Sequence, residues 1–242
     1  MFNKIVLKRS NKIDGEMPFW ISFADLMTAC MTLFLVVMIV TILALQKKYA
    51  NKMTEEKARQ DSIESCSVEL KNAAKVNFPN AKIRYNKGDS INIDLGSIVN
   101  FESGKYAISS EGGHFLRTYI PSVLNTVQSK QCSAYFRRVV VEGYTDIDGS
   151  YLSNLLLSLQ RSREVVCALS KPDSAGNNLT ENQLKEVRDH FLVGGFSFNS
   201  LKKKKSDSRR VELKLEFWQL NEKDRHNNPQ TNALSNKEFG KC

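Results

Sequence analysis

An uncharged, apolar segment stands out near the N-terminus of the chain. From Trp20 to Leu45 it reads WISFADLMTACMTLFLVVMIVTILAL, and Asp25 is its only charged residue. As a helix these 26 residues would extend about 39 Å, which exceeds the roughly 30 Å of a bilayer's hydrocarbon core. The segment is too long for a cleaved signal peptide, and no small-residue cleavage site follows it. We therefore predict a transmembrane helix over residues 20–45.

The next segment, residues 46–80, is rich in charge, lacks glycine and has its only proline at Pro79. This composition predicts a helical linker. Alternating steps of four and three residues give only four apolar positions out of seven, which is a weak coiled-coil seam: Tyr49, Met53, Ile63 and Leu70. A dimerising helix, a channel-plugging helix and a solvated linker helix all remain open.

Patterns typical of strands and helices alternate from residue 81 to residue 220. Apolar and polar residues alternate over 91–95 and 209–217, and 138–143 is a short apolar run, so strands are expected there and a further one over 191–198. Helical periodicity predicts helices over 109–130, 153–170 and 180–190, the last with a T-x-x-Q capping signal. This order predicts an α/β sandwich with helices on one face of a sheet. The polar residues 221–242 are expected to form a flexible tail.

The net charge of +9 does not by itself indicate a nucleic-acid-binding protein. The charge is scattered, its densest patch is Lys202–Lys205 with Arg209 and Arg210, and no nucleic-acid-binding module accompanies it. The three histidines are too dispersed for a metal motif, and no Ser or Cys nucleophile motif is present. We therefore expect no nucleic-acid partner, no metal, no cofactor and no covalent catalysis.

Asp25 is the strongest candidate for a functional residue in the apolar segment. A carboxylate at the centre of a membrane helix costs roughly 2.5–3.5 kcal/mol on insertion scales, so such residues are functional by default. Ser22, Thr28 and Thr32 share its helix face and form a small polar stripe. We predict that Asp25 carries an ion, with these three residues in support. A structural carboxylate that hydrogen-bonds a partner helix is the alternative.

Residues 139–166, VVVEGYTDIDGSYLSNLLLSLQRSREVV, carry the motif G-x-T-D, a glycine and then N-x-x-L-S-x-x-R. An R-R-V-E element follows at 209–212. These elements resemble the signature of the outer-membrane-protein-A-like (OmpA-like) peptidoglycan-binding domain. The resemblance covers about residues 85–217 and implies that domain over 81–220. It departs at Ser162, where the family commonly has alanine, and at Lys202–Lys205, where it often has a proline-containing loop.

In that family an Asp and an Arg hold the diaminopimelate of the cell-wall peptide, and by position these are Asp146 and Arg161. Asp146 can pair with the ammonium group, and Arg161 can bind the carboxylate through two parallel N–H bonds. An intramolecular salt bridge between Asp146 and Arg161 is the alternative. The peptidoglycan-binding residues implied by the resemblance are Thr145, Asp146, Asn154, Leu157, Arg161 and Arg210.

Residues 18–34, PFWISFADLMTACMTLF, resemble the membrane signature of flagellar motor stator B subunits. In those proteins the motif's Asp carries the transported ion, and two B subunits sit inside a ring of five A subunits. The short N-terminus and compact linker look more like the B subunits of the Zorya anti-phage defence system. The resemblance implies a homodimer within a ring of A-type subunits that transports protons or sodium ions. A flagellar stator and a purely structural peptidoglycan tether are the alternatives.

A peptidoglycan-binding domain places the C-terminal part of the chain in the periplasm. Basic residues in 1–19 favour a cytoplasmic N-terminus, although Lys47, Lys48 and Lys52 make charge alone a weak guide. We expect a single-pass protein of the bacterial inner membrane.

Four of the five cysteines, Cys66, Cys132, Cys167 and Cys242, would then be in an oxidising compartment, which permits disulfides. Free thiols remain an alternative, because connectivity cannot be deduced from sequence. The helix over 153–170 should return towards the start of the strand over 138–143. This topology predicts a disulfide between Cys132 and Cys167.

Overall fold

The computed structural model describes residues 17–77, 82–96, 98–172, 176–220, 222, 238–240 and 242. Most of the predicted N-terminal segment 1–19 and of the predicted tail 221–242 lies outside these residues. The chain divides after Thr54 into two units, a helical one and a globular one that begins at Glu55.

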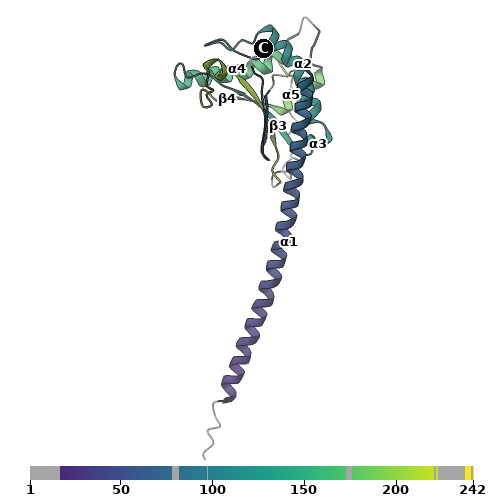
Figure 1. Ribbon diagram of the computed structural model, residues 1–242, viewed down its shortest axis with the longest axis vertical. Helices are drawn as coiled ribbons and strands as arrows, with labels where there is room; N and C mark the ends of the chain where they lie inside the picture. Colours follow the sequence, from purple (N-terminus) through teal and green to yellow (C-terminus); the bar gives the residue numbers. More distant parts are fainter. Residues whose placement is uncertain are drawn as a thin grey trace, which may run out of the picture. The chain divides into compact units, whose positions relative to one another are not determined.

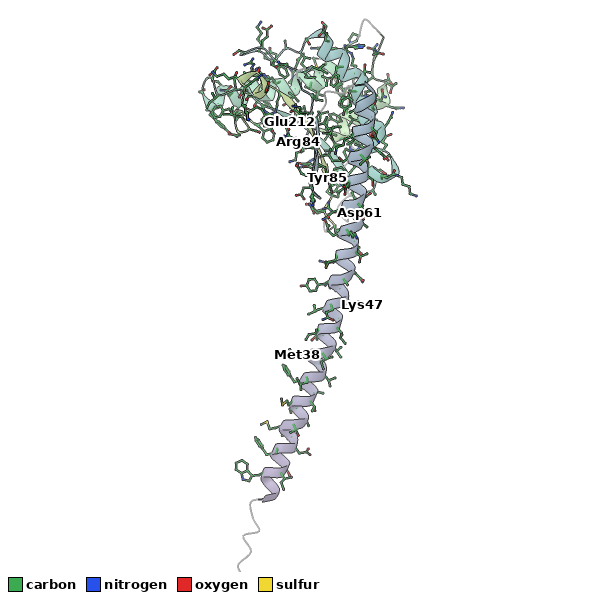
Figure 2. The ribbon with its side chains drawn as sticks, viewed as in Figure 1. Met38, Lys47, Asp61, Arg84, Tyr85 and Glu212 are labelled. Atoms are coloured by element: carbon green, nitrogen blue, oxygen red, sulfur yellow. A yellow bond between two sulfur atoms is a disulfide. The ribbon has the colours of Figure 1, made fainter. Side chains whose placement is uncertain are left out.

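A single helix, α1 (Met17–Asn77), contains both the predicted transmembrane segment and the predicted linker (Figure 1). Its apolar part is long and hydrophobic enough to cross a membrane, with a mean hydropathy of 2.6 over its most apolar window. Side chains there are exposed from Trp20 onward, including Met38 and Lys47, which Figure 2 shows pointing away from the helix axis. In this first unit the helix has no neighbouring element among the described residues.

The globular unit is built on a five-stranded sheet in the order β1-β2-β5-β3-β4. Its strands are β1 (Lys82–Asn86), β2 (Ser90–Asp94), β3 (Phe136–Gly143), β4 (Phe191–Gly195) and β5 (Val211–Phe217). All neighbouring strands are antiparallel except β3 and β4, which are parallel and are joined through helices. The β1–β2 turn contains Gly88 with a φ of 81°, a conformation that glycine adopts without steric cost.

The helices are α2 (Ser110–Val127), α3 (Lys130–Ser133), α4 (Tyr151–Ser170), α5 (Glu181–His190) and α6 (Lys205–Ser208). At the starts of three of them a capping side chain accepts a hydrogen bond from a backbone N–H group; these caps are Ser109, Ser150 and Thr180. Thr180 and Gln183 complete the capping box that the sequence indicated. Figure 1 shows α2, α3 and α5 on the same side of β3 as the C-terminal part of α1. The predicted α/β sandwich is confirmed.

Alternation along the strands separates the two faces of the sheet. Ile91, Ile93, Leu213 and Leu215 are buried in the core beneath the helices. The residues between them, such as Asn92 and Glu212, project from the other face, where charged side chains pair across strands. One face therefore supplies the hydrophobic core, and the other is available for polar chemistry.

The C-terminal part of α1 belongs to the globular unit, although the sequence placed the start of the domain at residue 81. Ile63, Cys66, Leu70 and Ala74 are buried in the domain's own core. Of the apolar positions that suggested a weak coiled-coil seam, Ile63 and Leu70 therefore pack against the chain's own domain. The predicted boundary was wrong because a helix of charged residues with one apolar stripe has the same pattern whether it packs on a partner chain or on its own domain.

The predicted disulfide between Cys132 and Cys167 is wrong. Cys132 of α3 is bonded to Cys66 of α1, with a Cα–Cα distance of 5.1 Å. Cys167 of α4 is bonded to Cys242, with a Cα–Cα distance of 5.8 Å. The prediction failed because it left α1 out of the domain. It also took residue 242 to be part of a flexible tail, whereas Cys242 is attached to α4 and Phe239 packs against the core.

Candidate functional site

Several loops converge at one edge of the sheet. Strands β2 and β3 both run antiparallel to β5, and β4 runs parallel to β3, so the C-terminal ends of β2, β3 and β4 lie beside the start of β5. Backbone hydrogen bonds join the following loops, from Thr145 N to the Ser197 carbonyl and from Tyr144 N to the Arg210 carbonyl, both at 2.9 Å. The T-D and R-R-V-E motifs, which are far apart in the sequence, therefore meet at this edge.

Asp146 is buried at this edge, with 5% of its surface exposed. Its Oδ2 accepts a hydrogen bond from Nη1 of Arg209 at 3.0 Å, and its Oδ1 accepts one from the backbone N–H of Asp148 at 3.3 Å. The salt-bridge alternative is thus only half correct, because Asp146 is ion-paired in the structure, but with Arg209 rather than Arg161. Arg209 was absent from the predicted site, although it is the first residue of the R-R-V-E element.

Arg161 of α4 is completely buried. Its guanidinium donates to the backbone carbonyls of Lys105 at 3.0 Å, Tyr144 at 2.9 Å and Glu102 at 3.1 Å. It also lies 5.0 Å from the centre of the Phe101 ring. Burial lowers the pKa of Arg161 to about 10, partly offset by the charge of Asp146, so the side chain stays protonated at neutral pH. In this structure Arg161 joins two loops, and its three guanidinium nitrogens each donate to a backbone oxygen.

The other predicted residues of the T-D motif region shape the loop. Asn154 donates to the carbonyls of Asp148 at 2.9 Å and Ser150 at 3.1 Å, which fixes the turn after Asp146. Thr145 is buried, and among the described residues its hydroxyl has no hydrogen-bond partner. Leu157 is half-buried on α4. These residues line or support the site. Among the described residues of the loop after β3, Asp146 is the buried acidic residue.

Close packing of α4 on the sheet sets the position of Arg161. A Cβ atom on Gly143 would lie 2.0 Å from the Ser158 carbonyl oxygen, so only glycine permits this approach. Ser162, where the family commonly has alanine, donates a hydrogen bond to the Gly194 carbonyl at 2.8 Å. This departure from the family pattern therefore adds a polar link between α4 and β4.

Arg210 is also buried and is held on the charged face of the sheet. It donates to Glu212 at 2.7 Å and to the Ser200 carbonyl at 3.0 Å, and it lies 4.2 Å from the centre of the Tyr144 ring. Glu212 also accepts from Arg84 at 2.9 Å, and Figure 2 labels this pair. Burial alone would raise the pKa of Glu212, but the hydrogen bond from Arg210 and the neighbouring positive charges outweigh it and lower that pKa.

Asp25 lies in the first unit, where the structure provides no partner for its carboxylate among the described residues. Thr28 donates its hydroxyl to the Asp25 backbone carbonyl at 2.8 Å, and Thr32 donates to the Ala29 carbonyl at 2.9 Å. Both threonines thus bond their own helix turn, as mid-helix threonines usually do. Ser22, Asp25, Thr28 and Thr32 are all exposed on the helix surface. The polar stripe therefore lies on the exposed surface of the helix.

No family model matches the chain. A curated protein does: Zorya protein ZorB of Escherichia coli O139:H28 (strain E24377A / ETEC) is 38% identical over 222 residues, which cover 91% of this chain and 89% of that protein. The chain belongs to the ZorB family.

Several solved structures are also similar to part of this chain. A MotB-like protein from Desulfovibrio vulgaris is 15% identical, with 67% of this chain and 99% of that one covered and a TM-score of 0.46. The periplasmic domain of Helicobacter pylori MotB (residues 78–256) is 14% identical, with 61% and 88% covered and a TM-score of 0.42. The cell wall anchor of the T6SS from Pseudomonas aeruginosa is 16% identical, with 62% and 97% covered and a TM-score of 0.40.

Within the described part of this ZorB-family chain, no three His, Cys, Asp or Glu side chains gather as a metal site. The acidic and basic groups at the sheet edge instead form ion pairs and hydrogen bonds with one another.

Proposed function

We propose that this ZorB-family chain is the peptidoglycan-anchored B subunit of an ion-driven motor in the bacterial inner membrane, and that the motor serves anti-phage defence. One observation carries the proposal: a single chain joins a lone carboxylate on an apolar, uncovered helix to a separate globular domain with a polar binding edge. A purely structural tether would need the second feature but has no use for Asp25 in the first.

In the proposed cycle Asp25 takes up a proton or sodium ion from the periplasmic side and releases it to the cytoplasm. The membrane potential supplies about 2.3 kcal/mol per charge for each 100 mV. Neutralising Asp25 changes which contacts the helix prefers, because an ionised carboxylate needs hydrogen-bond donors and a neutral one tolerates apolar surroundings. Each ion thus shifts the populations of the contacts between the helix and its partner subunits.

The partners in this proposal are a second copy of the chain and a surrounding ring of A-type membrane subunits, with five A to two B subunits. The exposed apolar side chains of α1 and the small polar stripe at Ser22, Thr28 and Thr32 suit close helix packing. The N-terminus lies in the cytoplasm and the globular unit in the periplasm, where it holds the B subunits on peptidoglycan while the ring moves. Asp146 is the acidic group of the wall site, and Thr145 and Asn154 support its loop.

The test is Asp25→Asn in cells that carry the complete system, with phage plating efficiency and proton flux as the readouts. We expect protection and flux to disappear at normal protein levels, since the change removes a charge that disfavours insertion. Cys30→Ser, an exposed position on the same helix, is the matched control and should behave as wild type.

Full protection by Asp25→Asn would contradict the motor and favour a tether. Loss of motility rather than of phage resistance would favour a flagellar stator.

A further inference from the structure

Strand β4 forms one edge of the sheet, and among the described residues no strand pairs with its outer side. The backbone N–H of Phe196 bonds the Gly143 carbonyl of β3 at 3.0 Å. Alternation along a parallel ladder therefore turns the backbone N–H and C=O groups of Val193 and Gly195 away from β3, towards the free edge. The strand reads FLVGG and carries neither a charged residue nor a proline, which commonly protect exposed edges.

Helix α4 covers β3 and β4, and one of its flanks faces this free edge (Figure 1). A Cβ atom on Gly143 of β3 would meet the Ser162 hydroxyl, whereas one on Gly195 of β4 would meet the Leu159 backbone nitrogen at 2.9 Å. The flank that holds Leu159 is therefore the one nearer the edge. It carries an apolar stripe at the spacing of helical neighbours, 73%, 59% and 43% exposed in chain order: Leu152, Leu156 and Leu159.

The free edge of β4 and the apolar stripe of α4 together form what we call the edge groove. Side chains alternate across a sheet, so Val193 lies on the same, helix-covered face as Gly195 and the buried Phe191. A strand added beside β4, at the usual spacing of about 4.7–4.9 Å, would direct every second side chain towards the stripe. Contiguous exposed apolar surface of this kind marks interaction sites.

Arg163 sets the charge of the edge groove. It follows Leu159 by about one helical turn, is exposed and forms no ion pair with a described residue. An isologous contact between two copies of the chain would bring α4 and β4 against the same elements. These elements contain only one acidic residue, Glu164, which is already paired with Lys171. A carboxylate for Arg163 must therefore come from another protein.

We propose that the edge groove binds an extended segment of another protein, with apolar side chains at alternate positions and an acidic residue at one end. The segment adds a strand to β4, its apolar side chains pack on the stripe, and its carboxylate pairs with Arg163. Because α4 runs from the end of β4 back towards its start, Arg163 lies near the start, beside the C-terminal end of an antiparallel segment. The wall site uses the loop after β3, so the two kinds of binding can be lost separately.

The test is a fluorescence titration of the full-length chain in detergent with a short synthetic peptide of alternating threonine and valine that ends in glutamate. Two further peptides carry backbone N-methyl groups, one on its valines and the other on its threonines. Only alternate N–H groups of an added strand bond the edge. One methylated peptide should therefore bind like the parent, and the other about 10-fold more weakly or less.

Variants of the chain test the side chains. Leu156→Asn should weaken binding about 10-fold, because the contact loses apolar area. Arg163→Gln should weaken binding of the glutamate peptide about 2- to 5-fold, the range for an exposed ion pair, and leave a peptide that ends in glutamine unaffected. Val68→Asn, at an exposed apolar position of α1, is the matched control and should bind as the wild type does. Melting curves of each variant verify folding.

Three results would overturn the edge groove: no peptide binding by the wild type, equal binding by the two methylated peptides, or binding unchanged in both Leu156→Asn and Arg163→Gln. If Leu156→Asn instead dissociated a dimer of the full-length chain in ultracentrifugation and left peptide binding unchanged, the face would hold a second copy and the proposed partner would be wrong. Asp146→Asn should not affect peptide binding. Loss of binding in that variant would place the peptide at the wall site and would also contradict the groove.

Discussion

Asp25 and Asp146 are both carboxylates in regions where an unpaired charge is unfavourable, yet the chain supplies partners for only one of them. Asp146 has Arg209 and a backbone N–H within hydrogen-bonding distance. Asp25 sits on a helix where Thr28 and Thr32 bond backbone carbonyls of their own turn, and its surroundings are exposed apolar side chains. Asp146 of the globular unit is therefore compensated within the chain, whereas the Asp25 carboxylate has no partner among the described residues.

Because of this difference, removing a polar side chain should affect the stability of the two units differently. Removing a polar side chain from the globular unit leaves its former partners buried and unpaired, so stability should fall. Removing the Asp25 carboxylate leaves no described partner behind, so folding should be unaffected and only function should change.

The largest loss of stability is expected for Arg161→Met. The change leaves three backbone carbonyls without their donor and removes a positive charge near Asp146. Breaking a buried charged network of this kind costs about 3–5 kcal/mol, so we expect the melting temperature of the globular unit to fall by on the order of 10 °C. Calorimetry of the full-length chain measures this.

Asp146→Asn is the informative comparison for Arg161→Met. It keeps an acceptor for Arg209 and should remain folded while losing peptidoglycan in a pull-down assay. If Arg161→Met instead kept its melting temperature and lost only binding, Arg161 would be a ligand-binding residue and the structural role assigned to it would be wrong.

The sequence predicts the longer helices and four of the five strands of the globular unit because burial imposes a period on them, but it does not predict β1, Lys82–Asn86. The predicted helix over 180–190 is observed as Glu181–His190, and the strand over 209–217 as Val211–Phe217. The meeting of the T-D and R-R-V-E motifs could be inferred only from the family resemblance, since no local pattern specifies which strands are neighbours.

What the sequence could not predict depends on contacts between distant segments. The partners of Arg161 are backbone carbonyls of Glu102 and Lys105, and a carbonyl has the same chemistry in every residue. Likewise, the choice between Arg209 and Arg210 as the partner of Asp146 depends on how the chain enters β5. The cysteine pairing depends on the docking of α1, which an amphipathic pattern leaves undetermined.

The next largest effect is expected from the disulfides. Cys66 and Cys132 close a loop of 66 residues, and Cys167 and Cys242 close one of 75. Loops of this length predict about 2–4 kcal/mol of stabilisation for each bond, so each double Cys→Ser variant should melt at a lower temperature than the wild type. Cys30→Ser should melt as the wild type does, because Cys30 is an exposed free thiol.

Peptide mapping without reduction checks the pairing directly in protein from an oxidising compartment. A linked Cys132–Cys167 peptide would restore the pairing that the sequence suggested and would contradict the packing of α1 on this domain. If the Cys66 and Cys132 double variant lost stability and the Cys167 and Cys242 double variant did not, the disulfide that attaches α1 to the domain would be the stabilising one.

The smallest change in melting temperature is expected when either of two neighbouring glutamates is replaced by glutamine, and its sign should differ between the two. Glu142 and Glu212 lie directly opposite each other on β3 and β5, both buried. Burial raises the pKa of Glu142, an effect that the hydrogen bond from Tyr144 and the charge of Lys214 only partly offset. The pKa of Glu212 is lowered, since its three basic partners outweigh the burial that alone would raise it.

A carboxyl group whose pKa is raised on folding stabilises the protein while protonated, and that stability is lost as pH rises through its folded pKa. Ionised Glu142 is thus unfavourable at pH 7, and Glu142→Gln, which keeps an acceptor for Tyr144, should raise the melting temperature by at most about 4 °C, the shift that 1 kcal/mol produces in a domain of this size. Glu212 contributes stability above its unfolded pKa that is lost as pH falls through its folded pKa, so Glu212→Gln should lower the melting temperature at pH 7. Both differences from the wild type should shrink as the pH falls and the wild-type carboxylates become protonated. Melting curves at several pH values measure both differences. A lower melting temperature for Glu142→Gln than for the wild type at pH 7 would contradict the prediction. It would show that Lys214 and Tyr144 fully compensate the buried charge of Glu142 within the chain.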